Sequence, residues 1–197
     1  MLIESCDPRD PVVVQLGQEQ QSELAAAEGE SHISYPLQDG IEFVAGFVDG
    51  RPVACGALQP LGAGVGEIKR MYVRPPYRGQ GLSRLILAAL EELAVRRGYR
   101  TLRLETGNYL APALGLYRSA GYRPIPLFGA YVGNPISVCF EKQLSPVEVA
   151  RVSRPPPPPR CPPEPAGGRG AAGGPGAQTA HPPRAPRSAA TASPASH

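Results

Sequence analysis

The sequence has little of the chemistry that metal sites and nucleophilic relays need. Its 197 residues include no Trp, three His and four Cys. The cysteines show no CxxC spacing and no neighbouring histidine, a pattern that favours neither a zinc site nor a disulfide framework. His181 and His197 lie near the C-terminus, so a Ser-His-Asp or Cys-His relay would depend on His32 alone. We therefore expect no metal, no such relay and a reduced, cytoplasmic setting.

The chain also lacks a long hydrophobic run. Its most apolar stretch, residues 82–95, is interrupted by Arg84, Glu91 and Glu92. The opening residues, MLIESCDPRD, do not show the basic and then apolar pattern of a signal peptide. The sequence therefore predicts neither a secretion signal nor a membrane partner.

Large apolar side chains are absent from the C-terminal part. Residues 146–197 contain no Phe, Tyr, Leu, Ile or Met, and 20 of these 52 residues are Pro or Gly. Such a segment cannot bury a core, so we expect a disordered C-terminal tail after one ordinary domain, residues 1–145. Five consecutive prolines, residues 155–159, favour polyproline II geometry. Both a functionless extension and a docking segment for an unknown partner stay open.

Charge is unequally divided between these two parts. The tail carries six Arg and two Glu, whereas the whole chain has a net charge of +3, so residues 1–145 have a net charge of −1. A nucleic-acid-binding domain is expected to present a basic stripe of its own. We therefore expect no nucleic-acid partner.

Hydrophobic periodicity predicts an α/β domain. The strongest helical pattern runs over residues 82–97, where apolar residues recur at intervals of three and four. Asp49-Gly50 joins two apolar runs and is a typical hairpin turn. Strands are expected at residues 2–5, 41–48, 52–58, 67–73, 101–105, 122–125 and 137–142, and helices at residues 11–27, 82–97 and 111–120. This order predicts a mixed sheet with helices on its faces.

The segment between the fourth strand and the strongest helix is suited to phosphate. Gly79 and Gly81 let backbone amides face one point, the helix N-terminus adds partial positive charge, and Arg78 could add a full one. A glycine turn needed only for packing is the alternative. The usual nucleotide motifs fail, because Arg84 stands where a dinucleotide fingerprint needs Gly and no GK[ST] is present.

Two motifs at matching spacing carry a resemblance to a known family. They are RGQG, residues 78–81, and LYRSAGY, residues 116–122. With the order of elements over residues 2–143, the sequence resembles the GNAT superfamily of acetyl-CoA-dependent N-acetyltransferases. The resemblance implies the GNAT fold: a central, mixed, mostly antiparallel sheet with helices on both faces and a splayed central strand pair.

The resemblance also implies a cofactor site for acetyl-CoA as acyl donor. The amides of Met71 and Val73 would bind the pantetheine arm, and the Met71 amide would stabilise the oxyanion of the thioester carbonyl. The residues expected to bind the cofactor are Met71, Tyr72, Val73, Arg78, Gly79, Gln80, Gly81, Leu82, Ser83, Asn108 and Tyr117.

Glu67 and Tyr117 match the positions of the family's general base and general acid. Strand alternation would place Glu67, Lys69, Met71 and Val73 on one face, so that Glu67 looks into the cleft of the thioester. The alternative for Glu67 is a solvated residue at the start of a strand. Tyr117 would protonate the departing thiolate, and its alternative is a plain core residue.

Two positions differ from the family pattern, and the acceptor site is less defined. Leu110 stands where many relatives have an Asn that holds the cofactor amide, and Asn108 or Thr106 could substitute; Ser83 replaces a small Gly or Ala. Candidates for binding the acceptor's ammonium group, each with surface decoration as the alternative, are Glu19, Glu23, Tyr35, Glu105 and Tyr131.

The expected function is transfer of acetyl from acetyl-CoA to a primary amine by direct attack in a ternary complex, without a metal. The acceptor would be a small molecule or a protein amino group. A non-catalytic acyl-CoA-binding sensor is the alternative. The oligomeric state, a homodimer included, stays open.

Overall fold

The computed structural model describes residues 1–29 and 32–145 of the chain, and the predicted tail lies outside these residues. None of the helices described is both long enough and apolar enough to cross a membrane. The strands are β1 (Leu2–Cys6), β2 (Glu42–Val48), β3 (Arg51–Gly62), β4 (Val65–Val73), β5 (Thr101–Gly107), β6 (Arg123–Ile125) and β7 (Ser137–Gln143). The α-helices are α1 (Pro11–Glu28), α2 (Leu82–Arg96) and α3 (Ala111–Ser119), with short 3-10 helices η2 (Pro75–Tyr77) and η3 (Gly129–Tyr131).

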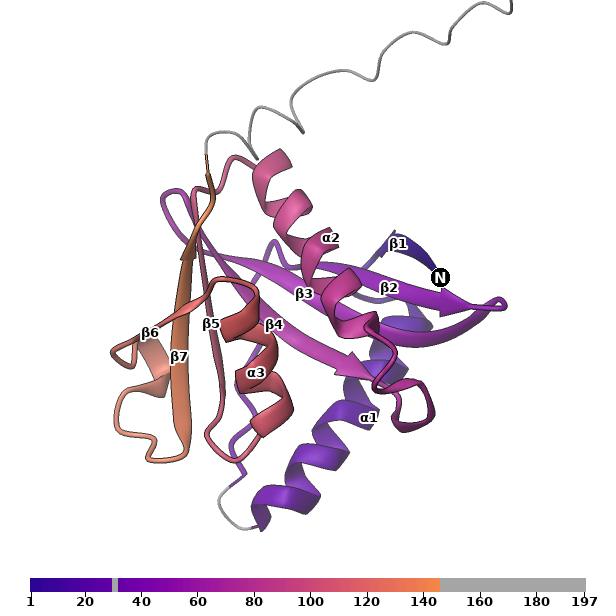
Figure 1. The fold of residues 1–197 in the computed structure, drawn as a ribbon, viewed down its shortest axis with the longest axis horizontal. Coiled ribbons are helices and arrows are strands. Elements are labelled where there is room, and N and C mark those ends of the chain that lie inside the picture. The colour runs from indigo at the N-terminus through magenta and orange to yellow at the C-terminus, as the bar shows by residue number, and fades with distance from the viewer. Residues whose placement is uncertain (30–31, 146–197) are drawn as a thin grey trace, which may run out of the picture. The chain divides into compact units, whose positions relative to one another are not determined.

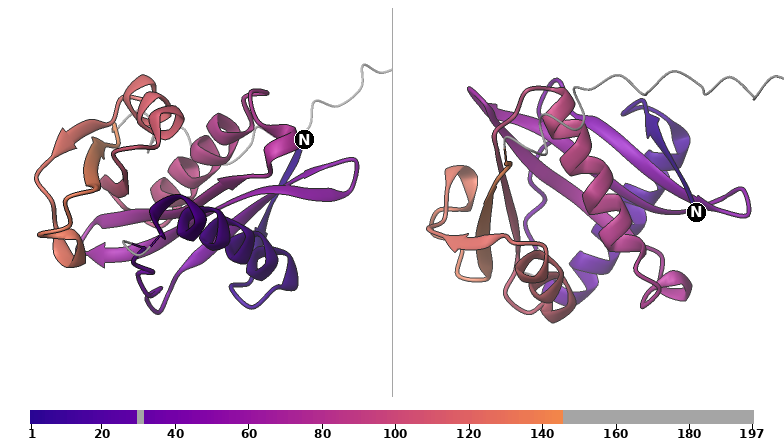
Figure 2. Two further views of the ribbon diagram at one scale, coloured as in Figure 1. Left: turned by 90° about the horizontal axis from the view of Figure 1, so that it is seen from below. Right: turned by 45° about the horizontal axis from the view of Figure 1, so that its top comes forward.

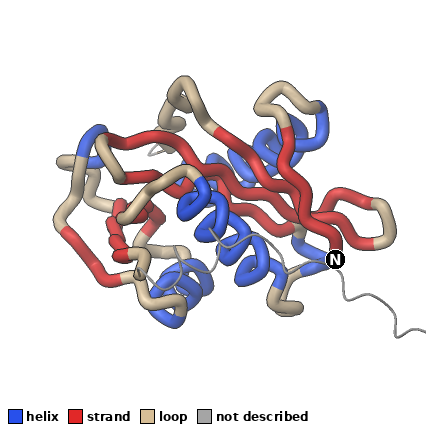
Figure 3. Tube along the Cα trace, turned by 90° about the horizontal axis from the view of Figure 1, so that it is seen from above, coloured by secondary structure: helices blue, strands red, loops and turns tan. Residues whose placement is uncertain are grey.

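All the strands belong to one mixed sheet (Figure 1, Figure 3). Their order is β1-β2-β3-β4-β5-β7-β6, and every neighbouring pair is antiparallel except β4 and β5. The predicted mixed, mostly antiparallel α/β fold is therefore confirmed. The predicted strands are all present, and β3 and β5 are longer than the apolar pattern indicated.

Helices cover both faces of the sheet (Figure 2). On one face, α1 packs Val13 and Leu16 against side chains of β2, β3 and β4. On the other face, α2 supplies seven of the eighteen buried residues of the main core, to which α3 adds Tyr117. The start of α1 follows from its sequence, because the Asp10 side chain accepts a hydrogen bond of 2.8 Å from the Val12 amide and Pro11 opens the helix.

The parallel pair β4 and β5 separates partway along its length. Its pairing extends only from Val65↔Thr101 to Ile68↔Leu104. Strand β4 nevertheless continues to Val73 and β5 to Gly107, so the two strands splay apart beyond the last pair. This is the predicted splayed central pair, and it leaves a gap in the middle of the sheet.

A β-bulge reverses the alternation of β4 just where the gap begins. Arg70 has φ of 55°, and the register with β3 shifts between Cys55 and Ala57. Ile68 lies before the bulge and Met71 after it, and both pack into the core beside α2. They are three residues apart, so regular alternation would have placed them on opposite faces. The expectation that Glu67, Lys69, Met71 and Val73 share a face is therefore wrong, because one irregular residue moves Met71 and Val73 to the α2 side.

We expect Gly56→Val to lower the free energy of unfolding by about 1–3 kcal/mol, because it overpacks the core. A Cβ at this position of β3 would lie 2.7 Å from Leu90 Cδ1 and 2.9 Å from both Ile86 Cγ2 and Met71 Sδ. Gly62→Val in the same strand is the control, since no atom lies within 4 Å of its added Cβ. Urea unfolding of both variants measures the difference, and equal stability would contradict this packing.

Candidate active site

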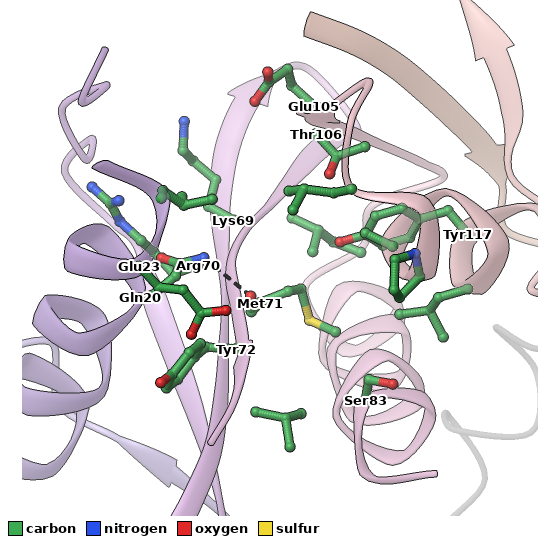
Figure 4. Close-up of a pocket in the computed structure, with 18 of the residues that line it drawn as sticks. Gln20, Glu23, Lys69, Arg70, Met71, Tyr72, Ser83, Glu105, Thr106 and Tyr117 are labelled. Atoms are coloured by element: carbon green, nitrogen blue, oxygen red, sulfur yellow. Dashed lines mark hydrogen bonds between the residues drawn. The ribbon is translucent and has the colours of Figure 1, made fainter. Parts of the chain in front are cut away.

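The gap between β4 and β5 opens into a cavity of about 610 Å³. Its wall is formed by α1 and the loop after it, β4, the turn into α2, the end of β5 and the start of α3. Figure 4 shows that Met71 extends from β4 toward Tyr117, whereas Lys69 and Arg70 extend to the opposite side. The bulge thus gives the cavity two chemically different halves.

The turn into α2 presents a row of free backbone amides. Gly79 and Gly81 have φ of 75° and 80°, values that glycine adopts without strain. Within the described part of the chain, the N–H groups of residues 79–83 have no hydrogen-bond acceptor. Because the positive end of the α2 dipole lies at the same place, this turn suits a phosphate or diphosphate group.

Arg78 and Arg74 connect this turn to α1. Arg78 Nη2 donates to Glu23 Oε2 at 2.7 Å, and Arg78 Nε donates to the Val73 carbonyl at 2.8 Å. Arg74 makes two hydrogen bonds to the Glu19 carboxylate, of 2.7 and 2.8 Å. Glu19, an expected acceptor residue, therefore holds Arg74 and does not line the cavity.

The Tyr117 side chain lies at the α3 side of the cavity with its hydroxyl toward β4 (Figure 4). The residue is 4% exposed, and its ring contacts the rings of Tyr122 and Phe140. Burial, followed by the negative charge of Glu105, raises the pKa of the Tyr117 phenol. Its hydroxyl therefore stays protonated at neutral pH, and none of the residues described accepts or donates a hydrogen bond there. A protonated phenol facing a cavity can act as a proton donor.

Glu67 is buried beside the cavity and both of its oxygens are engaged. Oε2 accepts a hydrogen bond of 2.8 Å from Gln59 Nε2, and Oε1 accepts one of 2.6 Å from the Tyr131 hydroxyl. Lys69 Nζ donates to the same hydroxyl at 2.6 Å and lies 3.7 Å from Oε1. Burial and the bond to Glu67 raise the pKa of Tyr131, and burial lowers the pKa of Lys69. Tyr131 and Lys69 line the cavity, so Glu67 is connected to it through them.

Glu105 places a carboxyl group on the cavity wall, near the end of β5. Its Oε1 accepts a hydrogen bond of 2.5 Å from Ser137 Oγ, and burial raises its pKa. With Glu23, Tyr35 and Tyr131, it is one of the expected acceptor residues that do line the cavity. The cavity wall beyond Met71 thus combines carboxyl groups and phenols with the cationic side chains of Lys69 and Arg70.

The structure brings most of the predicted site residues together. Those that line the cavity are Met71, Tyr72, Val73, Arg78, Gly79, Gly81, Leu82, Ser83 and Tyr117. Glu67, Gln80 and Asn108 do not. The Gln80 side chain donates to the Pro76 carbonyl at 3.4 Å, and Asn108 Nδ2 donates to the Pro135 carbonyl at 3.3 Å. Thr106, the other residue considered in place of Asn108, does line the cavity, as does Leu110.

Two wall residues had no signal in the sequence. Gln20 Nε2 donates to the Met71 carbonyl at 3.1 Å, from a stretch of α1 that reads as an ordinary polar helix face. Arg70 lines the cavity because of the bulge, which strand alternation does not reveal. Within residues 1–29 and 32–145, no group of three or more His, Cys, Asp or Glu side chains could hold a metal ion.

Comparisons with known proteins agree with this geometry. The model of the acetyltransferase (GNAT) family matches residues 13–122. An IAA acetyltransferase of Azospirillum brasilense is 39% identical over 105 residues, which are 53% of this chain and 69% of that protein. The uncharacterized N-acetyltransferase YsnE of Bacillus subtilis is 38% identical over 92 residues, 46% of this chain and 61% of that protein.

Solved structures show the same fold. A Klebsiella pneumoniae protein named as an acyl-CoA N-acyltransferase has a TM-score of 0.63 and 34% identity, over 73% of this chain and 97% of that one. A GNAT family acetyltransferase from Elizabethkingia anophelis, solved with acetyl-CoA bound, has a TM-score of 0.55 and 19% identity, over the same shares of the two chains. At that identity the second likeness concerns the fold alone.

We expect Gly81→Glu to abolish CoA binding, because it puts a negative charge among the free amides and forces a side chain onto a residue with φ of 80°. Gly98→Glu is a matched control at the other end of α2. Its φ is 79°, and neither glycine has an atom within 4 Å of an added Cβ. Calorimetry with CoA compares the two; wild-type affinity in a folded Gly81→Glu variant would remove the phosphate assignment.

Proposed function

The chain belongs to the acetyltransferase (GNAT) family, and on that premise we propose that it transfers the acetyl group of acetyl-CoA to a primary amine. The observation that carries the proposal is the row of free amides at residues 79–83, which leads into a cavity faced by the Tyr117 hydroxyl. We assign the activity to residues 1–145, with a small molecule or a protein amino group as acceptor.

In the proposed reaction the thioester carbonyl lies at the Met71 amide, in the gap between β4 and β5. The neutral amine attacks this carbonyl directly, and a C–N bond forms without a covalent enzyme intermediate. A hydrogen bond from the Met71 amide to the developing oxyanion would contribute about 3 kcal/mol. Gln20, which donates to the Met71 carbonyl, helps to hold this part of the bulged strand in place.

Proton transfers precede and follow this attack. The acceptor's ammonium group first loses a proton toward Glu67, which is reached through the Tyr131 hydroxyl that already donates to Glu67 Oε1. The nitrogen releases its second proton to solvent once the C–N bond has formed. Tyr117 gives its proton to the departing thiolate and later regains one from solvent. The raised pKa of the Tyr117 phenol keeps this proton in place until the thiolate forms.

Release of the CoA thiol from acetyl-CoA over a panel of amines tests the proposal. Amine-dependent release, together with an acetylated product, supports it. Binding of acetyl-CoA without release for any amine would instead favour a non-catalytic acyl-CoA sensor.

Tyr117→Phe is expected to lower kcat by about 10²- to 10⁴-fold with little change in acetyl-CoA affinity, because only the departing thiolate needs the proton. The deficit should shrink at alkaline pH and with an acetyl thioester of a more acidic thiol. Tyr122→Phe is the control, since its ring lies 5.9 Å from that of Tyr117 and does not line the cavity. Steady-state kinetics measure the deficit. If the loss of kcat is the same with the more acidic thiol as leaving group, Tyr117 is not the general acid.

Glu67→Gln is expected to lower kcat by a similar factor, about 10²- to 10⁴-fold, and to recover at high pH because more of the amine is then neutral. If the proton passes through Tyr131, Tyr131→Phe should act on the same step. The double variant should then be little worse than the poorer single variant. Deficits in kcat that multiply would show that the two residues act independently.

A further inference from the structure

Arg70 is the cation on the cavity wall whose charge is left uncompensated. Three Lys or Arg side chains line this cavity in the described part of the chain: Lys69, Arg70 and Arg78. Lys69 lies 3.7 Å from Glu67, and Arg78 lies 2.7 Å from Glu23. Among residues 1–29 and 32–145 no carboxylate lies within 4.0 Å of Arg70, whose Nη2 donates only to the Tyr35 carbonyl, at 3.2 Å.

The backbone holds Arg70 in an unfavourable conformation that directs it into the site. Its φ of 55° is uncommon for a residue other than glycine, and such strain is concentrated at functional positions. The bulge places its side chain beside Lys69, on the opposite side of β4 from Met71 and Tyr117 (Figure 4). Half-buried and always charged, the guanidinium is partly desolvated there, and burial lowers its pKa.

We propose that Arg70 binds a carboxylate of the amine acceptor, so that the acceptor is an amino acid or a similar carboxylate-bearing amine. The identity of the acceptor rests on the proposed function, whereas the binding of an anion at Arg70 does not. A guanidinium is a planar fork of five N–H donors that fits a carboxylate with two parallel hydrogen bonds. Arg70 and Met71 are consecutive residues of β4 and line the same cavity, so an acceptor whose carboxylate is held by Arg70 can extend its amine toward the proposed thioester position.

The phosphates of CoA are a poorer match for Arg70. The free amides that suit a diphosphate belong to residues 79–83, at the N-terminus of α2. Arg70 instead lies in the half of the cavity with Tyr35 and Tyr131, whose rings meet edge to face at a centroid distance of 4.6 Å. Ile33 and Ile136 also contribute to the wall. These rings and aliphatic groups favour an acceptor with an apolar side chain.

The test compares each amino acid with its primary amide. The probes are leucine, phenylalanine, methionine and glutamate, each beside the matching amide, with acetyl-CoA as donor. For at least one apolar pair we expect the wild-type protein to favour the free carboxylate by about 10- to 100-fold in kcat/KM. The comparison works against the expected preference. The α-amine of an amino acid amide is less basic than that of the free amino acid, so more of it is neutral and able to attack.

Three variants assign the preference to Arg70. Arg70→Gln should abolish it, mainly by raising the KM of the amino acid while the KM of acetyl-CoA stays unchanged. Arg70→Lys keeps the charge but not the fork, so it should keep part of the preference. Arg96→Gln, at an exposed side chain of α2 that does not line the cavity, should behave as wild type.

Calorimetry separates this inference from the proposed function. The probes are titrated into the wild-type protein and Arg70→Gln, with and without CoA. Tighter binding of amino acids than of amides, lost in Arg70→Gln, supports the anion site even if no amine is acetylated. The inference is overturned if no carboxylate binds or reacts better than its amide, or if Arg70→Gln keeps the wild-type preference, even where acetyl transfer itself is confirmed.

Discussion

The backbone pairing between β4 and β5 stops before either strand ends, and the rest of the site depends on this. Backbone N–H and C=O groups inside a protein need partners, and a sheet normally supplies them. Here the pairing ends at Ile68↔Leu104 although both strands continue. Gln20 supplies one replacement by donating to the Met71 carbonyl. An extended ligand that carries amide groups of its own could satisfy others, and the proposed function uses the gap in this way.

The bulge at Arg70 gives this gap its chemical division. Without it, strand alternation would aim Met71 to the same side as Glu67, and the α2 core would lose a side chain that fills the space over Gly56. With it, the glycine turn at residues 79–83 and Tyr117 share the α2 and α3 side, while Glu67 and Lys69 share the other. The proposed reaction uses this arrangement, because the donor would bring its thioester carbonyl from one side and the acceptor amine would reach it from the other.

The sequence allowed the helices, the strands and the glycine turn before α2 to be predicted because their signals are local. The Asp49-Gly50 turn, the apolar period of α2 and the glycines beside Arg78 each act within a few residues. Strand order and the bulge depend on the whole sheet, so neither the place of β7 between β5 and β6 nor the orientation of Arg70 could be read from the chain. The family resemblance pointed to Glu67 as a candidate base, but its hydrogen-bond partner Tyr131 is 64 residues away in the chain and could not be predicted.

Helix α1 links the two halves, and its ion pairs orient it more than they stabilise it. Arg74 and Arg78 are four residues apart, as are their partners Glu19 and Glu23, so successive turns of α1 bind the segment that leads into the glycine turn. The Arg78–Glu23 pair is exposed and the Arg74–Glu19 pair is partly buried. Pairs at a protein surface are worth about 0–1 kcal/mol each, less than the burial of one core side chain such as Leu16. The packing therefore holds the helix on the sheet, whereas the ion pairs fix its position along it. That position is what brings Gln20 to the Met71 carbonyl, where donor and acceptor would meet.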